Sequence, residues 1–416
     1  MIVRKFMLWA ATAPAAERAE GAGSLARAYL YSGLDANDRR EAEIALTALL
    51  DDASPLVRKA LAEAFASSPD APRAIVAALA NDQSEIAAPV LGRSPLLGDG
   101  DLIDAAAIGD AFAQAAIALR PQVSNALAAA IAEVGAREAL IALTVNPGAD
   151  IPEFSMRRMI ERFGDDGELR EALLGRGELP GSVRSDLVMA AGAALSRFVV
   201  GCNWLPRERA DRAVREASEK AHVILAAETE QHKDWRGARA LAAHLRNAGR
   251  LTPGLVLRSL LSGDVFLFEA AVVELSGLPQ PKALALARDW RGAGFASLYR
   301  TAGLPERLLP VFRSALDARR TLAPQTGSAN LSRAMIERVL TATEQGDPVE
   351  TAALTALLRR FDAEAAREEA REAARVMFEE QLAPPVSIEA APESEEGAPR
   401  LIDIDLDAIE AELAAA

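Results

Sequence analysis

Apolar residues recur at intervals of three and four along most of this chain, the spacing that forms one face of an α-helix. Between residues 56 and 65, for example, Leu56, Leu61 and Phe65 belong to one apolar stripe. Each run is short and is bounded by Pro, Gly, Asp or Ser, which cap helices or stop them. The pattern predicts helices over residues 71–80, 102–119, 123–134, 137–143, 155–163, 167–174 and 183–200.

The joints between these runs follow a common pattern, seen first at Asp52-Ala-Ser54-Pro55. Asp52 and Ser54 offer side-chain acceptors where a helix N-terminus has unpaired N–H groups, and Pro55 suits the first helical turn. Arg58 follows Asp52 at a spacing that lets a carboxylate and a guanidinium bridge adjacent turns along a stack. Because the pattern recurs at Asp82, we expect pairs of short helices stacked into a solenoid.

A second punctuated segment lies further along the chain. Thr252 is predicted to cap a helix that Pro253 starts and Gly263 stops. Arg258 and Asp264 are predicted to pair across the turn at its end, in a structural role like that expected of Asp52, Pro55 and Arg58.

Composition favours helices throughout. Half of the 416 residues are hydrophobic but only 5% are aromatic, and the apolar content is mostly Ala and Leu, the strongest helix formers. No apolar run is long enough to span a membrane. The first residues loosely resemble a signal peptide, but Pro14 and charged residues follow directly, so a first helix that caps the core is favoured. A single cysteine, Cys202, fits a reducing cytoplasm.

Two resemblances go beyond these patterns. The turn with Asp52, Val57 and Arg58 is similar to a HEAT repeat, in which such an Asp and Arg have a structural role. The segments SPLLGDGDLID (94–104), NAGRLTPGLVLRSLLSGDVFLFEAAVVELSGLP (247–279) and GFASLYRTAGLPERLLPVFRSALD (294–317) resemble the alphaproteobacterial domain of unknown function 2336 family. The resemblance covers most of residues 1–320 and implies a helical fold with HEAT-like N-terminal repeats, a bacterial cytoplasmic setting and no established reaction.

The predicted fold is therefore all-α: an α-α superhelix with a second helical domain and a disordered acidic C-terminal tail. The expected parts are HEAT-like repeats (1–200), a second helical domain (201–320), a linker (321–332), a helical extension (333–383) and the tail (384–416). Within the extension, helices are expected over residues 333–345 and 349–360, followed by a long charged helix.

The predicted parts differ in their net charge. The whole chain carries a formal charge of −14. Residues 201–320 hold 19 Lys and Arg against 13 Asp and Glu, a net charge of +6, whereas the tail holds 1 against 9, a net charge of −8. An acidic first half disfavours nucleic acid as a general ligand.

The basic block is the first candidate binding surface. It is interleaved with acids, which favours an ion-paired surface helix, but it could also meet an acidic peptide, a nucleic acid or a phosphate. Its candidate partner-binding residues are Arg209, Arg212, Arg215, Arg236, Arg239, Arg246 and Arg250.

The end of the tail is the second candidate. Its apolar residues alternate with acids, which suits an added β-strand, and some of them also share one helical face. These residues are Leu401, Ile402, Ile404, Leu406, Ile409 and Leu413. We predict that they dock, and the basic block is the best electrostatic complement within the chain. An autoinhibitory tail, displaced by a partner, follows as a hypothesis; a free solubilising tail is the alternative.

Catalytic signals are weak. His222, His232 and His244 fall close together, with acids at helical spacing, but the stretch reads as a solvated helix end and a metal site is disfavoured. His244 is expected near a helix C-terminus, and Cys202 as a small packed thiol. No nucleotide-binding, hydrolase or zinc motif is present, so no catalytic, cofactor-binding or metal-binding residue is predicted.

The sequence thus predicts a non-enzymatic cytoplasmic scaffold or adaptor that binds a protein or peptide on a solenoid surface. The alternative is a HEAT-like DNA-binding protein of the DNA-repair glycosylase type, which the acidic first half disfavours. The partner and the oligomeric state stay open.

Overall fold

In a computed structural model, which describes residues 2–177, 179–322, 330–344 and 348–382, every regular element is an α-helix or a short 3-10 helix. One isolated bridge joins Val123 to Ala149. The predicted all-α class is confirmed. Residues 1–366 and 367–416 form two separate units, and each is described by itself.

The first part of the chain consists of short helices. Their bounds are α1 Ile2–Ala10, α2 Ala15–Tyr31, α3 Ala36–Ala48, η1 Leu49–Asp51, α4 Pro55–Phe65, α5 Arg73–Ala80, α6 Ser84–Arg93, α7 Asp99–Ile108, α8 Ala111–Ala118, α9 Asn125–Val134, α10 Arg137–Val145, α11 Glu153–Phe163, α12 Gly167–Leu174 and α13 Gly181–Gly201.

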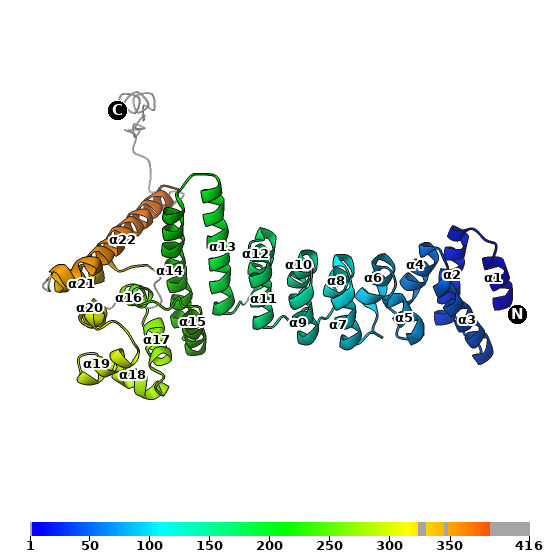
Figure 1. Ribbon diagram of the computed structural model, residues 1–416, viewed down its shortest axis with the longest axis horizontal. Helices are drawn as coiled ribbons and strands as arrows, with labels where there is room; N and C mark the ends of the chain where they lie inside the picture. The colour runs from blue at the N-terminus through cyan, green and yellow to red at the C-terminus, as the bar shows by residue number, and fades with distance from the viewer. Residues whose placement is uncertain (1, 178, 323–329, 345–347, 383–416) are drawn as a thin grey trace, which may run out of the picture. The chain divides into compact units, whose positions relative to one another are not determined.

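These helices stack in two rows, as Figure 1 shows. In one row α2, α4, α6, α8, α10 and α12 each pack on the next, and in the other α7, α9, α11 and α13 do the same. No single helix could bury its apolar face alone, but neighbours bury a continuous core that runs from Ala22 to Leu187.

One predicted helix is in fact two. The prediction of a single helix over residues 102–119 is wrong, because α7 ends at Ile108 and α8 begins at Ala111. The Asp110 carboxylate accepts hydrogen bonds from the backbone N–H groups of Phe112 and Ala113, so it caps α8. The pair Gly109-Asp110 inside the apolar run is the sequence feature that indicates this break.

The Asp-Arg pattern of the joints links successive helix pairs. Arg18 donates two hydrogen bonds of 2.8 Å to the Asp52 carboxylate, and Arg58 donates bonds of 2.6 and 3.1 Å to Asp82. Arg58 also donates to the Asp52 carbonyl at 2.7 Å. The structural role is as predicted, but each carboxylate pairs with an arginine from the preceding helix pair. Arg18 holds the pKa of Asp52 below its usual value.

At the same joint Pro55 opens α4 as predicted, and the Asp52 carboxylate accepts from the Ser54 N–H at 2.8 Å. The predicted capping bond from the Ser54 side chain is not formed.

The rest of the described chain is also helical. Its elements are α14 Arg207–Gln231, α15 Trp235–Asn247, α16 Pro253–Leu261, α17 Phe266–Ser276, α18 Gln280–Arg288, α19 Ala293–Thr301, η2 Glu306–Leu308, α20 Leu309–Leu322, α21 Arg333–Glu344 and α22 Pro348–Leu382. The two helices expected at 349–360 and beyond are one continuous helix, α22.

The apolar core changes near the predicted boundary at residue 200. A second core begins at Val223, and a third runs from Val256 to Ala365. The five-part division itself stays a prediction. Thr321 and Leu322 of the predicted linker end α20, and residues 323–329 and the tail lie outside the described residues.

The punctuation around α16 is as predicted. The Thr252 side chain accepts a hydrogen bond from the Leu255 N–H at 3.1 Å, and Gly263 follows the helix with a φ of +87°. The predicted pairing of Arg258 with Asp264 is wrong. Buried Arg258 forms its ion pair with Glu364 of α22 and stacks over the Phe361 ring at 5.2 Å. Asp264, also buried, accepts from Ser259 at 3.0 Å and from the Phe266 N–H at 2.8 Å.

Candidate functional site

The structure splits the predicted arginine block between two helices. Arg209, Arg212 and Arg215 lie in the first turns of α14, whereas the other four lie on α15 or just after it. Arg212 lies near the start of α14, whereas Arg236 lies at the start of α15, which follows the end of α14. These two side chains are therefore separated by most of the length of α14. The seven side chains therefore do not form one surface.

Most of the second group is already paired. Arg239 forms an ion pair with Glu274 at 2.8 Å, and Arg246 donates to the Glu274 carbonyl at the same distance. Arg250 lies 3.7 Å from Asp186. Arg236 is exposed and has no ion pair within the described part of the chain. For Arg239, Arg246 and Arg250 the structure shows intramolecular partners.

The first group is different. Arg209, Arg212 and Arg215 are all exposed, and none of them forms an ion pair within the described ranges. Two of their acidic neighbours are engaged elsewhere: Asp211 accepts from Ser196 at 2.9 Å, and Glu216 pairs with Arg360 of α22 at 2.5 Å. A third, Glu208, is exposed and forms no ion pair with them among the described residues.

Large apolar side chains are exposed at the same end of the α13–α14 pair. Leu195, Phe198, Trp204 and Leu205 have 58%, 56%, 68% and 38% of their surface accessible. The Phe198 and Trp204 rings meet edge to face, with centroids 5.5 Å apart. The bond between Ser196 and Asp211 fixes Leu195 and Arg212 at the same level of the helix pair.

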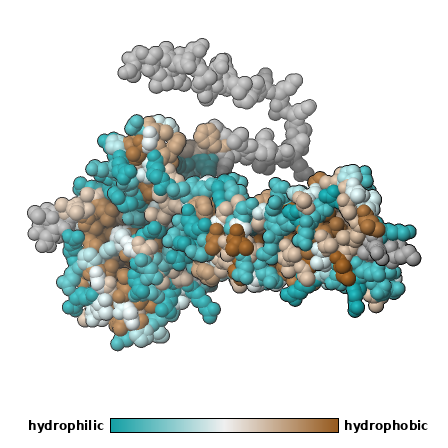
Figure 2. Space-filling view, turned by 45° about the vertical axis from the view of Figure 1, so that its right-hand side comes forward, coloured by the Kyte–Doolittle hydropathy of each residue, from teal (hydrophilic) through white to brown (hydrophobic). Residues whose placement is uncertain are grey.

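We call residues 195–215 the hairpin tip. Its turn contains Cys202, which is exposed, so the prediction of a packed thiol is wrong. The neighbours of Cys202 in the sequence, Gly201 and Asn203, are exposed as well. Figure 2 shows that hydrophobic side chains gather in local patches on an otherwise mostly hydrophilic surface. Contiguous apolar patches of this kind mark interaction sites.

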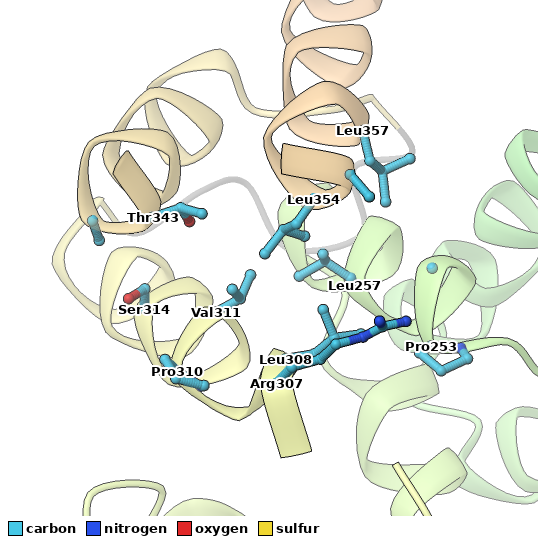
Figure 3. A pocket seen from close by; sticks show the side chains of 13 residues that line it. Pro253, Leu257, Arg307, Leu308, Pro310, Val311, Ser314, Thr343, Leu354 and Leu357 are labelled. Atoms are coloured by element: carbon cyan, nitrogen blue, oxygen red, sulfur yellow. The ribbon is translucent and has the colours of Figure 1, made fainter. Parts of the chain in front are cut away.

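A cavity of about 440 Å³ lies between α16, α20, α21 and α22 (Figure 3). We call it the α16 pocket. Leu257, Val311 and Leu354 point into it from three different helices. The other lining residues are Pro253, Gly254, Arg307, Leu308, Pro310, Ser314, Ala342, Thr343, Ala353 and Leu357.

The polar groups of the α16 pocket are few. Arg307 is exposed at its rim and has no ion pair among the described residues. The N-terminus of α16, with Pro253 and Gly254, lines another side and carries the positive end of the helix dipole. Thr343 uses its hydroxyl internally, donating to the Val339 carbonyl at 2.7 Å. The pocket is apolar, with positive charge at its edge.

A third polar cluster lies where α11, α13 and α15 meet. Asp186 accepts from His244 at 2.9 Å and from Arg157 at 3.0 Å. Burial would raise the pKa of Asp186, but the hydrogen bonds and charges of His244 and Arg157 together outweigh burial, and the pKa is lowered. Cavities of about 350 and 750 Å³ lie beside this cluster.

The same cluster contains His222, which is only 2% exposed and hydrogen-bonds Ser185 at 2.9 Å. Burial, with the charges of Arg250 and His244, lowers the pKa of His222 to about 4. Ser185 is fully buried, so this pair cannot reach a substrate, and we interpret it as structural. His244 lies in the last turn of α15 as predicted, and His232 is exposed.

Two of these features were missed by the sequence reasoning. The hairpin tip was visible as an apolar run, FVVGCNWL, across a helix break. The α16 pocket had no local signal, because its walls come from four different helices and α16 is separated from the other three by α17, α18 and α19. Within the described residues no group of three or more His, Cys, Asp or Glu could hold a metal ion, and no helix is long and apolar enough to cross a membrane.

Residues 86–348 match the model of a family described as "Uncharacterised protein conserved in bacteria (DUF2336)". The match covers more than half of the chain, so the protein belongs to this family, as its sequence segments indicated. No curated protein and no solved structure matches.

Proposed function

We propose that this member of the DUF2336 family is a non-enzymatic scaffold or adaptor that binds a protein partner through the hairpin tip. The observation that carries the proposal is the coincidence of exposed aromatic side chains with three exposed arginines that have no acid partner in the described chain. Trp, Tyr and Arg are the residues that most often dominate binding energy at protein interfaces.

The chemistry of the tip specifies the partner's surface. Phe198, Trp204 and their neighbours call for apolar side chains that exclude water from the rings. Arg209, Arg212 and Arg215 call for carboxylates or phosphates, which guanidinium groups bind with two hydrogen bonds. The best partner is therefore an acidic segment that also carries large apolar residues, in the bacterial cytoplasm, where a lone exposed thiol such as Cys202 stays reduced.

The chain's own tail has this composition. Residues 384–416 lie outside the described residues, but their sequence combines a net charge of −8 with the apolar strip Leu401 to Leu413. We propose that the tail docks on the same chain. A flexible tether gives an attached segment an effective concentration in the millimolar range, so weak docking in cis is sufficient.

Cys202 allows a direct test, because it is the only cysteine and lies in the hairpin turn. A cleavable photo-cross-linker attached to Cys202 samples whatever binds at the tip in a bacterial lysate. We expect a discrete cross-linked protein with the full chain. The double variant Phe198→Ser/Trp204→Ser and the triple variant R209E/R212E/R215E should each lose it.

Matched controls change similar residues elsewhere. Ile108 is 81% exposed on the repeats, and Arg40 is exposed without an ion pair in the described chain. Ile108→Ser and Arg40→Glu should leave the cross-linked product unchanged. Equal loss with the control variants, or a product that survives both tip variants, would refute the proposed site.

Duplex DNA is the alternative ligand, since three arginines also suit phosphates. It is less well supported, because the exposed apolar residues at the tip have no role in binding a phosphate backbone. Affinity for duplex DNA that falls steeply with salt and is lost in R209E/R212E/R215E would favour it.

A further inference from the structure

We propose that the α16 pocket is the docking site for residues 401–413 of the same chain. This inference rests on the proposed docking of the tail on the same chain and specifies where the tail binds. It moves the tail away from the arginines of the hairpin tip and places it in an apolar cavity of the same compact unit, residues 1–366.

The first argument is that the pocket needs an apolar occupant. The buried side chains of Leu257, Val311 and Leu354 converge on a cavity of about 440 Å³, and half-buried or exposed residues line the rest of it. A cavity of that size holds several side chains of a peptide. Apolar side chains of an occupant would complete the packing around these three residues.

The second argument is charge. Arg307 at the rim has no acid partner among the described residues, and the N-terminus of α16 adds partial positive charge on the facing side. Two acids that adjoin lining residues in the sequence have other partners: Glu306 lies 3.9 Å from Arg300, and Glu344 pairs with Arg359 at 3.3 Å. An occupant with carboxylates beside its apolar side chains therefore complements the pocket.

The third argument is that the tail carries this pattern. From Ile402 to Asp407 the residues are alternately apolar and acidic. In an extended chain, successive side chains point to opposite sides. Ile402, Ile404 and Leu406 can then enter the cavity while the intervening aspartates face the rim and Arg307.

The fourth argument is reach. α22 contributes Ala353, Leu354 and Leu357 to the pocket and ends at Leu382. From Leu357 to its end the helix rises by roughly 38 Å at 1.5 Å per residue. Residues 383–400 separate its end from Leu401 and can extend by up to roughly 60 Å. Residues 383–400 are therefore long enough to carry Leu401 from the end of α22 back to the α16 pocket.

The test uses the full chain and cysteine cross-linking. Asp405→Cys is combined in turn with the native Cys202 at the hairpin tip, with Ser314→Cys in the pocket, and with Ser297→Cys on the exposed surface of α19. The last two pairs use a Cys202→Ser background. Disulfide formation is followed under mild oxidation on non-reducing gels.

We expect the Ser314→Cys pair to form an intramolecular disulfide about ten-fold faster than the Ser297→Cys pair, because docking raises the local concentration. Arg307→Glu should slow it about ten-fold by replacing a charge-assisted hydrogen bond with repulsion. Arg212→Glu at the hairpin tip should not change it.

A second variant tests entry of the tail into the cavity without changing the charge of Arg307. A Cβ built on Gly254 meets no atom closer than the Thr252 hydroxyl oxygen at 3.8 Å, so a side chain fits there without disturbing the helix. Gly254→Leu fills the pocket mouth and should also slow the Ser314→Cys reaction. Far-ultraviolet circular dichroism and the melting temperature check that the fold is intact.

The other outcomes overturn the inference in different ways. Preferential reaction with Cys202 would place the tail on the hairpin tip and leave the proposed function intact. Disulfide-linked dimers would place the tail on a second copy. Equal, slow reaction at all three sites would show an undocked tail, and partner binding at the tip would still be decided by the photo-cross-linking experiment.

Discussion

The helix repeats and the hairpin tip use arginine in opposite ways. In the repeats, Arg18, Arg58 and Arg137 pair with carboxylates in the turns between helices, and Arg158 pairs with Glu133 of α9. Arg120, Arg162 and Arg176 donate to backbone carbonyls at the ends of neighbouring helices. At the hairpin tip, Arg209, Arg212 and Arg215 extend from the surface without such partners in the described chain.

This difference shows how to separate structural from functional charge in a helical stack. Helix C-termini leave carbonyl groups without partners, and a stack places the next helix close enough for an arginine to satisfy them. An arginine that performs this task cannot also bind a ligand. Arg209, Arg212 and Arg215 at the hairpin tip make no such bond to a helix end within the described chain, so their charge stays available.

The largest expected effect comes from Arg258, which ties α22 to α16. Its side chain is 4% exposed and pairs with Glu364. Arg258→Met should lower the free energy of unfolding by about 3 kcal/mol, because it removes a buried guanidinium and leaves the half-buried Glu364 carboxylate without its partner. Urea unfolding measures this. Arg359→Met, on an exposed pair of the same helix, should change it by less than about 0.5 kcal/mol, and equal effects would contradict the account.

His222 should make stability depend on pH. Its folded-state pKa is about 4, below the unfolded value of about 6.5, so the unfolded chain binds the proton first as the pH falls. The contribution of neutral His222 to the free energy of unfolding is fully present above pH 6.5 and is lost as the pH falls from 6.5 to 4. We expect a loss of about 2 kcal/mol from pH 7 to pH 5 attributable to this group.

The comparison with two variants isolates that contribution. His222→Gln keeps a polar group beside Ser185 and should show a smaller loss of stability between pH 7 and pH 5 than the native chain. His232→Gln alters an exposed histidine and should retain the native pH dependence. Identical pH profiles for all three proteins would show that His222 does not titrate as described.

Arg58 should have an intermediate effect. It connects Asp82 to the Asp52 carbonyl, and its side chain is 14% exposed. Arg58→Ala should lower the free energy of unfolding by about 1 to 2 kcal/mol, the cost of losing charge-assisted bonds at a partly buried site. Arg93→Ala breaks a half-exposed pair with Glu63 and should cost less than about 0.5 kcal/mol. The comparison fails if Arg93→Ala is the more destabilising change.

The smallest effect on stability is expected at the hairpin tip. Phe198→Ser and Trp204→Ser remove side chains that are mostly in water, so the free energy of unfolding should change by less than about 0.5 kcal/mol. A loss of several kcal/mol would mean that these rings belong to a core, and the surface would lose its role as a partner site.

The sequence predicted local features much better than convergent ones. Capping by Thr252, the start of α4 at Pro55 and the stacked helices all follow from short-range spacing. The Asp110 break was missed because the apolar run continues across it. The partners of Arg258 and Asp52 could not be predicted, because Glu364 and Arg18 reach them through the fold.

The candidate site shows the same limit. Arg209, Arg212 and Arg215 were identified from their spacing, but their grouping with Arg239, Arg246 and Arg250 assumed one surface. Helix direction decides this, since α14 carries the two groups to opposite ends. The α16 pocket could not be predicted at all, because no wall contributes more than a few ordinary apolar residues.

The central claim is that charge is structural in the repeats and free at the hairpin tip. A paired charge reversal tests it most directly, with thermal melting and Cys202 photo-cross-linking measured on the same samples. Arg58→Glu should lower the melting temperature and keep the cross-linked partner, whereas Arg212→Glu should leave the melting temperature unchanged and weaken the cross-link. If Arg212→Glu destabilises the fold as much as Arg58→Glu does, or leaves the cross-link intact, the distinction between the two regions is wrong.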